Sequence, residues 1–195
     1  FAKHSDWLYC VKSLDEFAAL FKSTNPVAAG VTAKVSAELS NTTSNLSTLV
    51  QAAVENHVAG AYWNADDVWT GFCHRVEAEV EHAHYRSHSV DLTEIGTWLV
   101  EHDPTVCIIE VRATVQVSVD VNVEFFMYDT IDHEELNFGS LEVSRDHEME
   151  VDVFITLRGD LEHAAVDELD PSIELAGGEY DVEVGEVEPD FDMES

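Results

Sequence analysis

The feature that most constrains the fold is a stretch in which apolar and polar residues alternate strictly, between residues 111 and 125. Successive side chains of a β-strand point to opposite faces, so this pattern predicts a strand with one buried and one solvated face. Strands of a parallel sheet are buried on both faces, so the alternation favours an antiparallel sheet. We expect either one long strand or two strands joined by a bulge. The apolar set is Val111, Ala113, Val115, Val117, Val119, Val121, Val123 and Phe125.

The same alternation returns further along the chain. Leu141 and Val143 begin a second series, which runs from Met149 to Leu157 and ends at a turn around Gly159. A shorter series from Tyr180 to Val184 follows a pair of glycines and predicts a last strand. The loop that joins the first two series is expected around residues 132–139.

The first half of the chain shows a helical period instead. Apolar residues recur at spacings of three and four between Val31 and Val58, and a polar stretch interrupts them at residues 40–45, so one long helix or two stacked helices are expected. Gly60 ends this region. A further helix is predicted from Asp66 or Asp67, carrying Trp69, Phe72, Val76, Val80 and Ala83 on one side, and a shorter one from Leu92 to Glu101.

These patterns predict an α+β fold with an N-terminal helical region followed by an antiparallel β-sheet region. We expect a helical region at 26–103 and an antiparallel β domain at 104–185, joined at Asp103-Pro104. Residues 1–25 are expected to form a separate strand and capped helix, the end of an α/β domain. Residues 186–195 form an acidic tail that is expected to fray.

The surface is expected to be covered with carboxylates. Asp and Glu outnumber Lys and Arg 40 to 9, which gives a formal net charge of -31, yet 45% of the residues are hydrophobic. A chain with this much apolar material can bury a core, so the charge is expected to coat a folded body. Ionic strength near 1 M reduces the screening length to about 3 Å, which makes such repulsion tolerable. We therefore expect a halophilic host.

The composition also predicts a cytoplasmic protein. Cys10, Cys73 and Cys107 are odd in number and widely spaced, which favours free thiols in a reducing compartment. No run of about 18 apolar residues and no lipidation signal occurs, so no membrane association is expected. The chain begins at Phe1 rather than Met, and we expect it to continue a longer protein.

One histidine and glutamate series is a candidate metal site. On the helix predicted near residue 75, spacings of three and four place five side chains on one stripe. A polar stripe opposite an apolar one is typical of a surface helix, so we interpret the series as a solvated face. The alternative is a metal site, because neutral histidine and carboxylate accept divalent transition metals. The series comprises His74, Glu77, Glu81, His84 and His88.

The other candidate sites lack the residue spacing of known metal or catalytic motifs. Asp129, Asp132, His133, Glu134 and Glu135 cluster in one loop, but they lack the ligand spacing and glycine of a calcium loop. We interpret them as a chance cluster in an acidic chain. Neither a Gly-x-Ser-x-Gly turn nor a glycine-rich phosphate loop is present.

Direct nucleic-acid binding is not expected. Phosphate contacts require Lys and Arg, and the chain offers no basic stripe. Arg75, Arg86, Arg112 and Arg145 are interpreted as partners of carboxylates.

The start of the chain resembles a known family. The run Trp7-Leu8-Tyr9-Cys10-Val11 followed by Ser13-Leu14-Asp15-Glu16-Phe17 resembles the closing strand and helix of PIN-like domains. The resemblance covers about the first twenty residues, and it implies a metal-dependent ribonuclease that uses magnesium or manganese. Its catalytic residues would lie before Phe1, so no cofactor is assigned to these 195 residues.

Two functions follow. The first is a non-catalytic C-terminal accessory or assembly region of a PIN-like ribonuclease from a halophile. The alternative is a stand-alone protein-interaction module without enzymatic activity. In both, the sheet is expected to bind a protein partner or a second copy of the chain.

Overall fold

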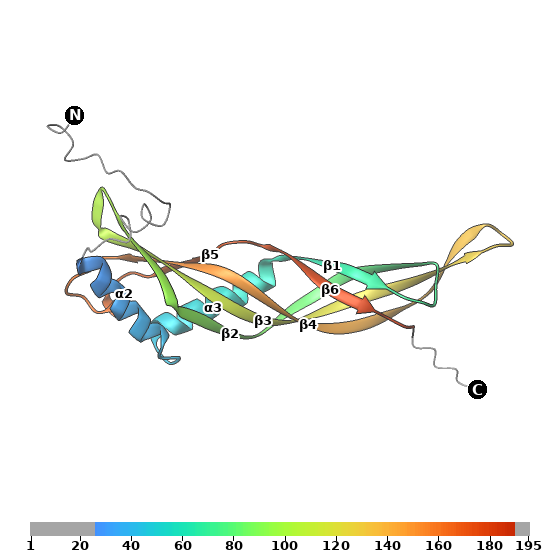
Figure 1. Cartoon of the computed structure of the whole chain (residues 1–195), viewed down its shortest axis with the longest axis horizontal. Coiled ribbons are helices and arrows are strands. Elements are labelled where there is room, and N and C mark those ends of the chain that lie inside the picture. The colour runs from blue at the N-terminus through green and yellow to red at the C-terminus, as the bar shows by residue number, and fades with distance from the viewer. Residues whose placement is uncertain (1–25, 190–195) are drawn as a thin grey trace, which may run out of the picture.

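The computed structural model describes residues 26–189, and these form an elongated molecule in which two helices precede two sheets (Figure 1). The helices are α2 (Pro26–Leu39) and α3 (Asn45–Gly60). Three long strands and one short strand form an antiparallel sheet in the order β2, β3, β4, β5. Two further strands, β1 and β6, form a parallel pair. The α+β class is confirmed, but strands dominate the described residues.

The bounds of the strands show how much of the chain is extended. β2 spans Arg75–Val100, β3 spans Asp103–Asp129 and β4 spans Glu134–Arg158. The remaining elements are β1 (Tyr62–Trp69), the short helix η1 (Val166–Glu168), β5 (Ser172–Leu175) and β6 (Glu179–Glu186). The long strand predicted from the alternating pattern is therefore confirmed, as are the second alternating series in β4 and the last strand in β6.

The core lies on one face of the central strand β3. Its apolar side chains from Cys107 to Phe125 are 0–1% exposed. The two helices cover one half of this face, and the β1 and β6 pair covers the other half (Figure 1). Neither α2 nor α3, the helices among the described residues, is long and apolar enough to cross a membrane.

The helices form where the apolar period predicts them. Leu46, Val50, Val54 and Val58 recur every four residues on α3 and are at most 1% exposed. Ser44 caps this helix, because its hydroxyl accepts a hydrogen bond from Ser47 N at 3.0 Å. The polar stretch at 40–45 is thus the turn between two helices, which resolves the alternative left open by the sequence.

The helices predicted after Gly60 are wrong. The segment from Asp66 to His88 lies in β1, a turn and β2, and Leu92–Glu101 belongs mostly to β2. The predicted helical region 26–103 is therefore helical only as far as Gly60. Two register shifts in the β2 and β3 pairing, between Val80 and His82 and between Tyr85 and Ser87, each add one residue to β2. These insertions make an alternating strand pattern resemble a helical one.

A single lysine fastens α2 to the loop before β5. Lys34 Nζ donates hydrogen bonds to the carbonyl oxygens of Leu161, Glu162 and Ala164 at 3.3, 3.1 and 2.8 Å. Bonds from a charged donor are stronger than neutral ones. One of the chain's few cations is therefore used to hold backbone carbonyls rather than to pair with a carboxylate.

Two histidines are packed between α3 and the strands. His57 Nε2 lies 2.7 Å from the Tyr180 hydroxyl, and the Tyr85 hydroxyl lies 2.7 Å from His88 Nδ1. Burial lowers the pKa of His57 below 6.5. Burial also lowers the pKa of His88, although the charge of Glu55 acts in the opposite direction. Both rings therefore favour the neutral form in the folded protein.

We expect this packing to make the protein less stable in mild acid. Since the folded pKa values are lowered, the unfolded chain binds more protons, and the free energy of unfolding falls as the pH drops below 6.5. Urea denaturation at about pH 8 and about pH 5.5 measures the loss. His88→Gln should reduce the loss, and His102→Gln, at an exposed position, is the matched control. An equal loss in the wild type and in His88→Gln would contradict this origin.

Candidate functional site

The structure separates the residues of the predicted metal stripe. His74 precedes β2, and its backbone N donates to Phe126 O at 3.1 Å. Glu77 pairs with Arg75, and His84 Nε2 lies 3.0 Å from Asp120 on the outer face of the sheet. Glu81 is exposed at the first register shift, whereas His88 points inward to Tyr85.

The stripe fails because it assumed a helix. On a strand, residues three apart point to opposite faces, and the register shifts after Val80 and Tyr85 change the face of the residues that follow, so the five residues do not converge. Among residues 26–189, no group of three or more His, Cys, Asp or Glu is arranged to hold a metal ion. The strand geometry therefore does not bring the five side chains of the candidate stripe together.

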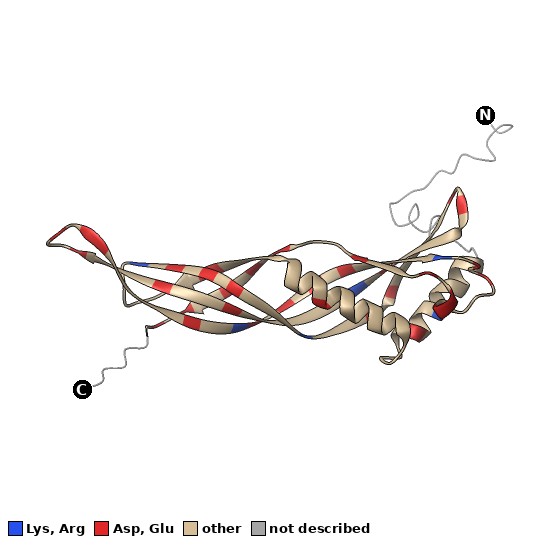
Figure 2. Cartoon of the chain, turned by 180° about the vertical axis from the view of Figure 1, so that it is seen from behind, with Lys and Arg blue, Asp and Glu red and all other residues tan. Residues whose placement is uncertain are grey.

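The outer face of the sheet is a solvated acidic surface. Acidic residues follow β2, β3 and β4 along their length, and basic residues are few (Figure 2). Asp120 accepts hydrogen bonds from Ser144 and His84, and the Ser144 bond is the larger cause of a lowered pKa of Asp120. Arg112 Nε binds Asp152 at 3.2 Å, as expected for an arginine that covers carboxylates. These contacts organise a surface and do not form a catalytic arrangement.

An exposed apolar cluster lies at the end of the molecule remote from the helices. It is formed by the turn between β1 and β2 and by the hairpin between β3 and β4, which projects beyond the other strands (Figure 1). Exposure ranges from 37% at Met127 to 84% at Ile131. We call this cluster the distal apolar surface; its members are Phe72, Met127, Tyr128, Ile131, Leu136 and Phe138.

Local contacts hold the distal apolar surface in shape. The rings of Phe72 and Phe138 lie 6.0 Å apart, which joins the turn to the hairpin. Arg75 reinforces this junction, since its guanidinium lies 4.3 Å from the centre of the Phe126 ring and donates to Glu135 at 2.7 Å. Side-chain contacts between the turn and the hairpin thus hold the distal apolar surface together.

The hairpin tip displays its apolar residues by a defined turn. Asp129 Oδ1 accepts a hydrogen bond from Ile131 N at 2.7 Å, and His133 has a positive φ of 57°. The Tyr128 hydroxyl lies 3.3 Å from His133 Nδ1. The acidic cluster predicted in this loop therefore caps a turn and surrounds an apolar tip. Sequence reasoning noticed the acids and missed the apolar residues between them.

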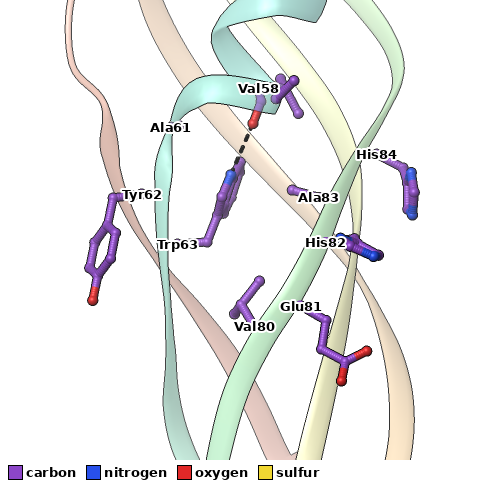
Figure 3. Close-up of a pocket in the computed structure, with 10 residues that line it drawn as sticks. Val58, Ala61, Tyr62, Trp63, Val80, Glu81, His82, Ala83 and His84 are labelled. Atoms are coloured by element: carbon purple, nitrogen blue, oxygen red, sulfur yellow. Dashed lines mark hydrogen bonds between the residues drawn. The ribbon is translucent and has the colours of Figure 1, made fainter.

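A groove lies between β1 and β2 (Figure 3). The groove has a volume of about 370 Å³. Val58, Trp63, Val80 and Ala83 form its apolar part, and Glu81 stands at its side. Trp63 Nε1 donates to Val58 O at 3.1 Å, so the polar atom of the indole is already satisfied.

Comparison with known proteins identifies no relative of the chain. No protein-family profile, no curated protein and no solved structure matches it. The resemblance to PIN-like domains falls on residues outside the described range, as do the predicted strand and helix of residues 7–22.

Proposed function

We propose that residues 26–189 form a non-catalytic protein-interaction module that docks a partner on the distal apolar surface. The observation that carries this proposal is the exposure of Ile131, 84%, in a chain of net charge -31. Clusters of exposed apolar residues with polar surroundings mark interaction sites. Molar salt would leave such a contact in place, because burial of apolar area does not depend on charge attraction.

The charges around the tip define the chemistry of the partner. Asp129, Asp132, Glu134 and Glu135 lie among the apolar residues in the sequence of the hairpin; Asp129 also caps the turn and Glu135 is bound by Arg75. A second copy would bring these carboxylates against their own equivalents, and like charges in contact are costly. The partner that fits is therefore a different protein with an apolar centre and lysine or arginine at its rim.

A cross-linking and affinity experiment tests this function. A photoreactive residue placed at position 132 should capture the partner in host cells, and the purified pair then gives a dissociation constant. Ile131→Ser should weaken binding by about 30-fold, as expected for an anchor worth about 2 kcal/mol. Val100→Ser, which alters an exposed apolar residue at the end of β2, is the control. Equal effects of both substitutions would refute docking at the tip.

A separate proposal is that this chain is part of a larger protein. The resemblance of residues 7–17 to the end of a PIN-like domain supports the idea that this module is the accessory region of a metal-dependent ribonuclease from a halophile. Reading the gene upstream of Phe1 tests it. An apolar strand followed by an acidic residue would support the nuclease, and an initiator Met directly before Phe1 would exclude it.

A further inference from the structure

The groove between β1 and β2 is bordered by two strands that lack a partner on one side. Among the described residues, β1 pairs only with β6, and β2 pairs only with β3. Each strand therefore presents a row of backbone N–H and C=O groups toward the space between the two sheets. The groove lies at the start of β1, whereas the distal apolar surface begins beyond its last residue, Trp69.

The residues that line the groove fit an extended polypeptide strand better than a small-molecule ligand. Small-molecule sites combine apolar walls with several converging polar side chains. The Trp63 indole is bound to Val58 O, and His84 is bound to Asp120. Tyr62, His82 and His84 also line the groove, but their side chains point away from Trp63 and do not converge (Figure 3). An apolar floor with free strand edges is what strand addition requires.

The carboxylates beside the groove determine which residue types a bound strand should carry. Glu81 lines the groove, and Glu77 and Glu79 precede it on the same edge strand; all three are exposed, and Glu77 is paired with Arg75. A strand that enters the groove turns alternate side chains to opposite faces. Apolar side chains would face Trp63 and Val80, and the others would meet carboxylates. The fitting segment therefore alternates apolar and basic residues.

We propose that the groove accepts an extended, alternately apolar and basic segment of a partner protein, which adds to β2 as a further strand. This site is distinct from the distal apolar surface, so either can fail in experiment without the other. An acidic segment, or a second copy of this acidic chain, would bring carboxylates against Glu81 and is disfavoured.

The probe is a capped octapeptide of alternating valine and lysine, titrated into the 195-residue chain and followed by backbone amide NMR. We expect saturable shifts confined to Tyr62–Asn64 and Val80–His84. The same peptide with N-methyl groups on alternate residues should bind at least 10-fold more weakly, because it keeps the charge and loses the backbone hydrogen bonds. A valine and glutamate peptide should not bind.

Two protein variants complete the test. Glu81→Lys reverses one charge at an exposed position and should weaken the lysine peptide several-fold, whereas Glu150→Lys on the outer face should leave affinity unchanged. Both variants are checked for folding by their amide spectra. Strand addition is overturned by equal affinity of the methylated peptide, by shifts on β4 or at the distal apolar surface instead, or by the absence of saturable binding. Equal binding of the glutamate peptide overturns the assigned charge.

Discussion

Ile155→Ala is expected to lower the free energy of unfolding by about 2–5 kcal/mol. Ile155 lies on β4 with no exposed surface, opposite Ile109 of the central strand, which is equally buried. Removing its side-chain atoms takes away burial and leaves a cavity that two paired strands cannot close. Urea denaturation measures the loss, and folded proteins of this size have only about 5–15 kcal/mol to lose.

Ile131→Ala is the matched control for this prediction. The substitution is chemically identical, but Ile131 is 84% exposed at the hairpin tip, so its effect on stability should lie within about 0.5 kcal/mol. The same residue is the proposed anchor for a partner, so its replacement should reduce binding and leave folding intact. A large loss of stability in Ile131→Ala would contradict the position of the tip outside the core.

The melting temperature is expected to rise by about 10 °C or more between about 0.1 M and 2 M potassium chloride. At 0.1 M the screening length is about 10 Å, so carboxylates on neighbouring strands of the outer face repel one another, and at molar salt it falls to about 3 Å. A rise of this size corresponds to about 3–5 kcal/mol for a domain of this length. Thermal denaturation followed by circular dichroism measures it.

A charge-reduced variant separates screening from a general effect of salt on apolar burial. The triple variant Glu142→Gln, Glu148→Gln, Glu150→Gln removes three exposed carboxylates from β4. If repulsion causes the salt dependence, this variant should melt higher than the wild type in dilute salt and show a smaller rise. An unchanged rise would argue against charge repulsion, and with it against the halophilic interpretation.

The alternating pattern predicted the centre of the fold because it reports burial directly. Residues 111–125 and 149–157 sit in the middle of the four-stranded sheet, where one face meets the helices and the β1 and β6 pair. There the period of two is uninterrupted, and the inward side chains of β3 are at most 1% exposed. No other structure places every second side chain on one face.

The segment that forms the edge strand β2 was predicted to be helical, and the error has a physical reason. Its inward residues are spaced by two, except where register shifts add a residue, so Val80 is followed by Ala83 and Tyr85 by His88. The resulting mixture of spacings imitates a helix. Bulges are common on edge strands, which are bound on one side only. The candidate metal stripe required that helix, and the structure has a strand there instead.

The sequence alone determined the class of fold, the two helices before Gly60, the buried face of β3 and the acidic coat, because each depends on local periodicity or composition. Tertiary structure decided the rest. The parallel pairing of Tyr62 with Glu179 joins residues far apart in the chain, and it creates the groove beside β2. The distal apolar surface likewise exists only because two loops meet at Phe72 and Phe138. Such contacts depend on where strands end in space, and no local pattern records that.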